Sequence, residues 1–345
     1  MKNLKYNYVY FNTSYLTRGR IDPNEYNAIC LRDATHLSGV KVVSTPLEHF
    51  PYFFRLLYRM YHTRCINKYV SLPFKKLWHP FVFKNDFKDA KPFCFVVSCN
   101  SLPIDYFYYL KKKYPTCKLV KLHRDLLKVT YENPEYSESN MRKIFDFRMT
   151  IDQNEAEKYG LLHFHEIESK IDLVQSKNYP LFDVFFAGKA KDRLPKLLEA
   201  YDMFSQAGLK CFFYITNARP DQMEKREGIV YSEKLMPYLD MLKYSINSRC
   251  MFDINQEGAL GFTSRFLEAV MYNKLLITDN PSVLDSKYYK SDYIQYFDDV
   301  SKIDVAFIND KKNVNYNYAG DFSPIHLIER IDEELVKRYG APQGC

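Results

Sequence analysis

Apolar positions along this chain fall into alternating short runs and helical stripes, which predicts strands and helices in succession. Residues 92–98 form a continuous apolar run, as expected of a buried parallel strand. A helix is expected at 102–114 and a second strand at 117–123, while the first 90 residues predict only a strand at 41–44 and a helix at 50–67. The series continues with helix, strand, helix and strand at 139–145, 146–151, 152–159 and 161–165. This order favours a parallel sheet covered by helices.

A second series of strands and helices follows the polar segment 169–180, which is the expected linker. Strands are expected at 181–187, 209–215, 228–231, 250–254 and 274–278, and helices at 194–206, 233–247, 263–272 and 324–339. We therefore predict an α/β protein with two Rossmann-like domains, 1–175 and 181–322, facing a central cleft. A C-terminal helix, 323–340, is expected to pack back towards the N-terminal domain. Ligands bind at the carboxyl ends of such sheets.

Length and composition favour a two-domain protein of the cytoplasm. The 345 residues exceed what one hydrophobic core usually spans. The chain has no apolar run of about 18 residues, and its start lacks the apolar region of a signal peptide. The eight cysteines include no CxxC pair, so we expect reduced thiols.

Positive charge is concentrated in the first half of the chain. Residues 1–180 hold 28 Lys and Arg against 18 Asp and Glu, whereas the remainder holds 21 against 24. Residues 50–84 contain seven basic residues, no acidic one and many large aromatics. This composition favours peripheral contact with an anionic membrane on its inner, cytoplasmic face. The alternative is a solvated basic face over an aromatic core; without a recognised motif, we expect no nucleic-acid partner.

The segment 252–269 carries the main candidate chemistry. A buried strand ends at Ile254, a loop containing Gly258 and Gly261 follows, and a helix begins near Thr263. The N–H groups and positive dipole end of a helix start form an anion site, which would include Thr263 and Ser264. The glycines allow a ligand to approach the backbone closely.

Two charged residues of this helix suit a nucleoside diphosphate. Arg265 in the first turn can grip phosphate through two hydrogen bonds. Glu268 lies three residues on and therefore on the same face, where a carboxylate suits the two ribose hydroxyls. The alternative is that Arg265 and Glu268 form an ordinary surface ion pair.

This pattern resembles the donor-binding half of GT-B glycosyltransferases, especially bacterial enzymes of polysaccharide, capsule and lipopolysaccharide biosynthesis. The resemblance rests on Gly261-Phe-Thr-Ser-Arg-Phe-Leu-Glu-Ala269, followed by Lys274-Leu-Leu-Ile-Thr-Asp-Asn280, and it covers roughly 181–285. It implies that Arg265 contacts the diphosphate and Glu268 the ribose. It also implies that the loop of Gly188, Lys189 and Arg193 faces the donor, and that backbone near Tyr231 and Ser232 holds the nucleobase.

One departure from the family concerns the mechanism. Retaining relatives carry two glutamates eight positions apart, but Leu260 stands where the first would be, with Glu257 nearby. The candidates for the chemical step are Glu257 and, after the 117–123 strand, His123 and Asp125. Asp33 and His36 form another N-terminal cluster. His163 and His165 lack a third ligand, so no metal site is expected.

The sequence therefore predicts a metal-independent, hexosyltransferase-like glycosyltransferase with no cofactor. Its donor would be a nucleotide-sugar, UDP-linked first and GDP-linked second, and its acceptor a glycan or lipid-linked glycan of surface polysaccharide biosynthesis. A nucleotide-sugar epimerase of the same fold, which needs no acceptor, and a non-catalytic nucleotide- or sugar-binding protein remain alternatives. A dinucleotide oxidoreductase is disfavoured, since no GxGxxG follows a predicted strand.

Overall fold

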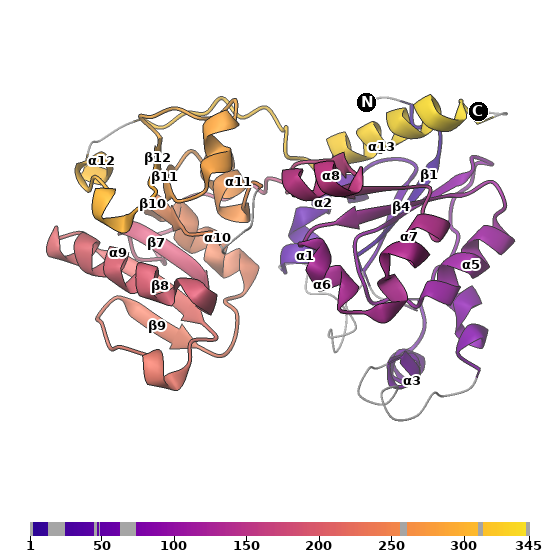
Figure 1. Ribbon diagram of the computed structural model, residues 1–345, viewed down its shortest axis with the longest axis horizontal. Helices are drawn as coiled ribbons and strands as arrows, with labels where there is room; N and C mark the ends of the chain where they lie inside the picture. Colours follow the sequence, from indigo (N-terminus) through magenta and orange to yellow (C-terminus); the bar gives the residue numbers. More distant parts are fainter. Residues whose placement is uncertain are drawn as a thin grey trace. The chain divides into compact units, whose positions relative to one another are not determined.

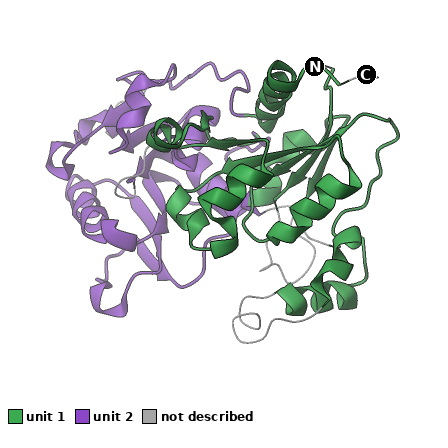
Figure 2. Cartoon of the chain, turned by 45° about the vertical axis from the view of Figure 1, so that its right-hand side comes forward, with its two compact units in different colours: residues 1–23, 27–169, 323–345 green, residues 24–26, 170–322 purple. Residues whose placement is uncertain are grey.

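The computed structural model describes residues 3–12, 25–44, 47, 49–62, 74–255, 261–309 and 313–342 (Figure 1). The chain divides into two compact units, which Figure 2 colours separately. The first comprises residues 1–23, 27–169 and 323–345, and the second residues 24–26 and 170–322. Each unit contains a six-stranded sheet.

The sheet of the first unit is parallel throughout and has the order β2-β1-β3-β4-β5-β6. Its strands are β1 (Asn7–Phe11), β2 (Val40–Val43), β3 (Phe93–Val97), β4 (Lys118–His123), β5 (Phe147–Thr150) and β6 (Leu162–His163). Every residue of β1 and β3 is buried, which is why β3 has an uninterrupted apolar run. The chain changes direction across the sheet between β1 and β3.

Strand β1 was not among the sequence-based expectations. Its run Asn7-Tyr-Val-Tyr-Phe11 contains two tyrosines, and a buried tyrosine needs a partner for its hydroxyl. The Tyr8 hydroxyl finds one, since it donates to Asp332 Oδ1 over 2.8 Å. That partner lies more than 300 residues away, so no local pattern indicates it.

Helices surround the first sheet. Those before β4 are α1 (Tyr26–Cys30), α2 (Arg32–Thr35), α3 (Tyr52–His62), the 3-10 helix η1 (Lys75–Phe81) and α5 (Ile104–Lys113). Those after β4 are α6 (Leu127–Tyr131), α7 (Glu138–Ile144), α8 (Gln153–Tyr159) and α13 (Pro324–Tyr339). The predicted helix 50–67 is seen as α3, and its last residues lie outside the described part.

The C-terminal helix α13 belongs to the first unit. Its residues Leu327, Ile328, Ile331 and Leu335 form a buried stripe. Ser323, its N-cap, donates to Asp33 Oδ2 over 2.6 Å, and Asp332 accepts from the Lys5 backbone N–H over 2.9 Å. These contacts attach the end of the chain to the unit in which the chain begins.

The sheet of the second unit is also parallel, with the order β12-β11-β10-β7-β8-β9. Its strands are β7 (Phe182–Lys189), β8 (Cys211–Thr216), β9 (Ile229–Ser232), β10 (Ser248–Asp253), β11 (Leu275–Thr278) and β12 (Ile294–Tyr296). The chain builds outward from β7 through β8 and β9, then returns to the other side of β7 with β10. This is the doubly wound Rossmann order, and its switch point lies between β7 and β10.

Two hydrophobic layers cover the faces of this sheet. On one face, the helix α9 (Leu194–Gln206) packs through Leu197 and Phe204 against a core that includes Phe252. On the other, α11 (Ser264–Met271) packs through Phe266 against a core that includes Met251. The unit also contains α10 (Tyr238–Ile246) and α12 (Ala306–Asn309). Adjacent residues of β10 thus face opposite cores, and the prediction of an α/β protein with two Rossmann-like units is confirmed.

One predicted boundary in this unit is wrong. The helix expected at 233–247 begins only at Tyr238, because Pro237 stands at its N-cap in an extended conformation. The residue before a proline avoids the helical region, so the chain cannot turn into a helix earlier.

Candidate functional site

The carboxyl ends of β7 and β10 lie side by side at the switch point of the second sheet. The two strands pair directly, with Val184 opposite Cys250 and Phe185 opposite Met251. Strand β7 ends at Lys189, which is exposed, and β10 ends at Asp253, which is buried. In open α/β sheets, ligands bind outside the carboxyl ends of the strands at this point.

Arg193 bridges these two strand ends. Its Nε donates to the Lys189 carbonyl over 3.0 Å, and its Nη1 donates to the Ile254 carbonyl. The guanidinium also lies over the Phe186 ring, 5.6 Å from the centroid. Burial lowers the pKa of Arg193, but an arginine remains charged in proteins. A fixed positive charge therefore stands at the switch point.

Gly188 makes room for that arginine. A Cβ atom built at Gly188 would lie 3.0 Å from Arg193 Nη2 and 3.0 Å from Phe186 Cζ. Such contacts are tighter than side chains normally tolerate, so a larger residue would displace the guanidinium. Glycine at this position thus serves the placement of Arg193.

The start of helix α11 is fixed to the end of β10 by Thr263. Its hydroxyl accepts from the Phe266 backbone N–H over 3.2 Å, which is an N-cap, and donates to Asp253 Oδ2 over 2.7 Å. Thr278 at the end of β11 donates to the same oxygen over 3.3 Å. Burial raises the pKa of Asp253, while the charges of Arg193 and Arg265 and both hydroxyls oppose that rise.

The backbone just before this helix is held by the segment after β11. The side-chain amide of Asn280, which is fully buried, donates to the Gly261 carbonyl over 2.7 Å. The Gly261 N–H donates to Ser282 Oγ over 3.2 Å, and Gly261 has a φ of 136°, which suits glycine. The predicted candidate Glu257 lies in the preceding loop, outside the described residues.

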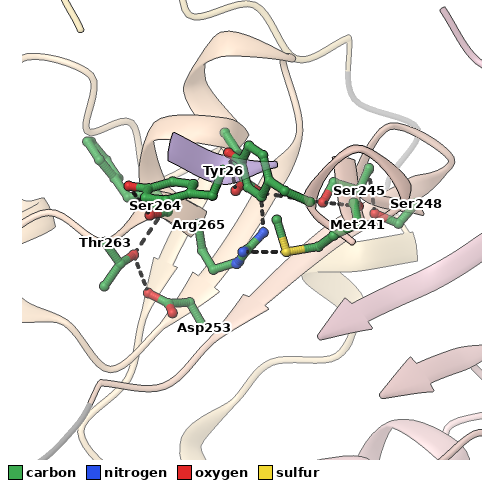
Figure 3. Close-up of polar contacts among 11 residues, drawn as sticks. Tyr26, Met241, Ser245, Ser248, Asp253, Thr263, Ser264 and Arg265 are labelled. Carbon is green, nitrogen blue, oxygen red and sulfur yellow. Dashed lines mark hydrogen bonds and ion pairs between the residues drawn. The ribbon is translucent and has the colours of Figure 1, made fainter. Parts of the chain in front are cut away.

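Arg265 reaches from α11 towards α10 (Figure 3). Its Nη1 donates to Glu268 Oε2, and its Nη2 lies 2.6 Å from Met241 Sδ. The side chain is 14% exposed. The guanidinium is therefore held in one orientation by the Glu268 carboxylate and the Met241 thioether.

Glu268 is fully buried between α10 and α11. The Tyr238 hydroxyl donates to Oε1 over 3.1 Å, and the Ser245 hydroxyl to Oε2 over 3.4 Å. Burial raises the pKa of Glu268, and Arg265 opposes this rise. In this arrangement, the carboxylate orients Arg265. The predicted contact with ribose hydroxyls would require one of these partners to move.

Tyr26 adds a residue from the start of the chain to this cluster (Figure 3). Its hydroxyl lies 3.4 Å from Ser264 Oγ, and its ring packs edge-on against Tyr238 at 4.9 Å. Sequence reasoning gave no role to Tyr26, Tyr238, Met241 or Ser245. These contacts arise from packing between distant segments, and no local pattern signals them.

Tyr231 and Ser232 stand farther from the switch point, since β8 separates β9 from β7. The Tyr231 side chain is half-buried against the hydrophobic layer that contains α9, and its hydroxyl accepts from the Glu224 N–H over 3.3 Å. Ser232 Oγ accepts from the Lys234 N–H over 3.1 Å. Both side chains thus stabilise local turns.

Two of the candidates for the chemical step, His123 and Asp125, belong to the first unit, at the end of β4. His123 is 1% exposed, with its Nδ1 3.3 Å from Thr130 Oγ1. Burial, followed by the charges of Lys121 and Arg148, lowers the pKa of His123 well below its usual value. Asp125, in the turn after the strand, is exposed to solvent.

Asp33 and His36, the other predicted N-terminal cluster, have different surroundings. Asp33 accepts from Ser323 at the start of α13, whereas His36 is exposed. Within the described ranges, no three His, Cys, Asp or Glu side chains gather as metal ligands would, although the His163 and His165 rings lie 5.0 Å apart. No helix in the described part of the chain is long and apolar enough to cross a membrane.

Comparisons with known proteins give similar structures only. No protein-family model matches the sequence, and no curated protein matches it. A glycosyltransferase from Rickettsia africae ESF-5 has a TM-score of 0.49 at 10% identity, covering 96% of this chain and 98% of that chain. A putative UDP-N-acetylglucosamine 2-epimerase from Listeria monocytogenes has the same score and identity, covering 96% of each chain. The lipopolysaccharide outer core galactosyltransferase WaaB has a TM-score of 0.44 at 10% identity, covering 96% of this chain and 99% of that chain.

Proposed function

We propose that this chain is a glycosyltransferase that takes a sugar from a nucleoside diphosphate-sugar and transfers it to a glycan or lipid-linked glycan. The observation that carries the proposal is the placement of two arginines at the switch point of the second sheet. Arg193 comes from the 3-10 helix η3 (Lys191–Arg193) after β7, and Arg265 from the first turn of α11. Both charges act on the same buried carboxylate, Asp253.

The electrostatics of this site favour a diphosphate. Burial lowers the pKa of Arg193 most, the carboxylates of Asp253, Asp192 and Asp279 raise it, and the like charge of Arg265 lowers it further by repulsion. A ligand with two or more negative charges would relieve that repulsion and would accept hydrogen bonds from both guanidinium groups. The N-terminus of α11 adds a partial positive charge, and Lys189 adds an exposed one.

We assign the other donor-side residues from their contacts. Gly188 leaves space for Arg193, Thr263 holds the helix start, and Ser264 lies beside Arg265 in the first turn. Glu268 acts through Arg265 in the arrangement described here, and a direct contact with ribose would follow a shift of Tyr238. The nucleobase, uracil first and guanine second, is assigned to the backbone near Tyr231.

The positive charge in this site comes from protein groups, which is the reason to propose donor binding without a metal ion. For the acceptor, Asp125 is accessible to a sugar hydroxyl, and a base must reach the proton that it removes. His123 would act only after a rearrangement that opens its buried ring. Asp125 is therefore our first candidate and His123 our second.

A thermal-shift panel of UDP, GDP, ADP, dTDP and CMP in the presence of EDTA tests the donor site. A ligand present at about 100 times its dissociation constant adds about 2.7 kcal/mol to the free energy of unfolding. We expect one diphosphate to stabilise the wild type and Arg265→Ala to lose the response. The matched control is Arg249→Ala, because Arg249 also pairs with a carboxylate, Asp183, but lies at the amino end of β10.

Two results would contradict the proposal: no response of the folded wild type to any nucleotide or nucleotide-sugar, or an equal loss in Arg249→Ala. Transfer is tested separately with the nucleotide-sugar identified in the panel. Release of the nucleotide only when a glycan acceptor is present supports a transferase. Interconversion of the sugar without any acceptor would indicate an epimerase instead.

A further inference from the structure

Helix α3 exposes its apolar stripe to solvent. Tyr52, Phe53, Leu56 and Met60 lie on one side of the helix, since their spacing places them within about a third of a turn. Their exposed fractions are 54%, 62%, 38% and 47%. Surface helices normally turn such a stripe towards the core, whereas these four side chains remain exposed within the described part of the chain.

The opposite side of α3 fixes the helix to the protein. Tyr58 is buried, its ring stacks on His62 at 4.1 Å, and it meets the Trp78 ring edge-on at 5.8 Å. Tyr61 also contacts Trp78, at 5.9 Å. The orientation of α3 is therefore set by packing, and the outward direction of the apolar stripe is part of the fold.

The 3-10 helix η1 extends this apolar surface. Phe74, which precedes it, and Leu77 within it are 72% and 68% exposed. Phe81 at its end is also exposed and contacts Phe50 at 5.4 Å, and Phe50 contacts Phe54 of α3 at 5.8 Å. Ring contacts thus link the two elements, and we call their exposed apolar side chains together the α3–η1 surface. Exposed apolar patches of this kind mark interaction sites.

The charges around the α3–η1 surface are positive. Arg55 and Arg59 follow Tyr52 at helical spacing, and Lys75 and Lys76 begin η1. No acidic residue occurs from Phe50 to Lys84. Two carboxylates of the same unit are paired with other side chains, since Asp105 lies 3.3 Å from His79 and Asp86 pairs with Lys41 at 2.7 Å.

We propose that the α3–η1 surface docks on an anionic lipid bilayer, with α3 lying in the plane of the interface. Exposed Phe, Leu and Met would enter the boundary between headgroups and acyl chains, while the basic side chains meet lipid phosphates. Tyrosine and tryptophan suit the same boundary, because each has an apolar ring and a polar tip. Figure 1 shows α3 at the margin of the first unit, away from its sheet. This proposal does not depend on the donor site.

Vesicle flotation with the full chain tests the proposal. One set of vesicles contains phosphatidylcholine alone, and the other contains phosphatidylcholine with about a third phosphatidylglycerol. The apolar variant is Phe53→Gln with Leu56→Gln, and the basic variant is Lys75→Gln with Lys76→Gln. The matched controls change exposed residues elsewhere: Val174→Gln with Leu235→Gln, and Lys112→Gln with Lys128→Gln.

We expect the wild type to float with the anionic vesicles and to partition at least tenfold less onto neutral ones. Most of the wild type's binding should be salt-sensitive. The basic variant should lose about fivefold in partitioning for each side chain removed. The apolar variant should lose about tenfold, and both controls should float like the wild type. Melting temperatures of all variants, compared with the wild type, show that a loss of flotation does not reflect unfolding.

A second readout localises the contact. Trp78 is the only tryptophan of the chain, and its ring contacts Tyr58 and Tyr61 of α3. Its emission should transfer energy to a headgroup-labelled anionic vesicle, and the apolar variant should lose that transfer. Absence of flotation with anionic vesicles, or an equal loss in the controls, would overturn the proposal. So would a wild-type dimer that the apolar variant converts to a monomer while leaving vesicle binding unchanged.

Discussion

The hydroxyl of Thr263 caps helix α11 and, over 2.7 Å, donates to Asp253 at the end of β10. The Thr263 side chain therefore joins the start of α11 to the end of β10. Arg193 is held beside the end of the same strand. The position of Arg265, two residues into the helix, depends on this link.

Thr263→Ala should reduce both stability and nucleotide binding, whereas Thr263→Ser should retain most of each. Loss of an N-cap costs about 1 to 2 kcal/mol, and here the buried Asp253 also loses a donor. Urea unfolding measures the free energy, and calorimetry measures nucleotide affinity. Equal behaviour of the alanine and serine variants would show that the hydroxyl does not hold the helix start.

Glu268→Gln should weaken the binding of inorganic pyrophosphate as well as that of the nucleoside diphosphate, by about tenfold for each. The reason is that Glu268 contacts Arg265 and has no exposed surface. Pyrophosphate has no ribose, so it separates the two roles. A variant that binds pyrophosphate normally and the nucleotide poorly would support a direct contact with ribose.

Gly188→Ala should lower nucleotide affinity about tenfold, because the new methyl group would displace the Arg193 guanidinium. The change should add little when Arg193 is already alanine. A double-mutant cycle on binding free energies measures this coupling. If the two effects are additive, Gly188 does not act through Arg193.

The depressed pKa of His123 predicts a loss of stability in mild acid. The folded protein holds the ring neutral, whereas the unfolded chain binds a proton below about pH 6.5. Stability is therefore retained above that pH and falls as the pH drops below it, by at most about 1.4 kcal/mol per pH unit. His123→Gln should lose less stability than the wild type between pH 7 and pH 5 in urea titrations. If the difference in free energy of unfolding between the wild type and His123→Gln stays the same from pH 7 to pH 5, the ring of His123 is not held neutral by burial.

Much of the fold follows from local sequence patterns, because most strands are covered on both faces. The run at β3 is apolar without interruption for that reason, and the helices between strands show their own spacing. Strand β1 was missed because its burial depends on Asp332, at the other end of the chain. A contact between residues so far apart in the sequence cannot be recognised from a short stretch of residues.

The candidate site also combines features that follow from local sequence with features that depend on distant residues. The position of Thr263 and Arg265 at a helix start could be predicted because a strand, a glycine loop and a helix start follow one another within a short segment. The surroundings of Glu268 could not, since Tyr238 and Ser245 come from another helix. The outward orientation of the α3 stripe was also not predictable, because the sequence gives the stripe but not the side that packs against Trp78.

The most direct test of the central claim compares a nucleoside diphosphate with its monophosphate by calorimetry, in the presence of EDTA. If Arg193 and Arg265 together grip the second phosphate, the wild type should bind the diphosphate at least tenfold more tightly. Both Arg193→Ala and Arg265→Ala should abolish that preference, and Arg249→Ala should keep it. A preference that survives in both arginine variants would contradict the claim that these two residues form the diphosphate site.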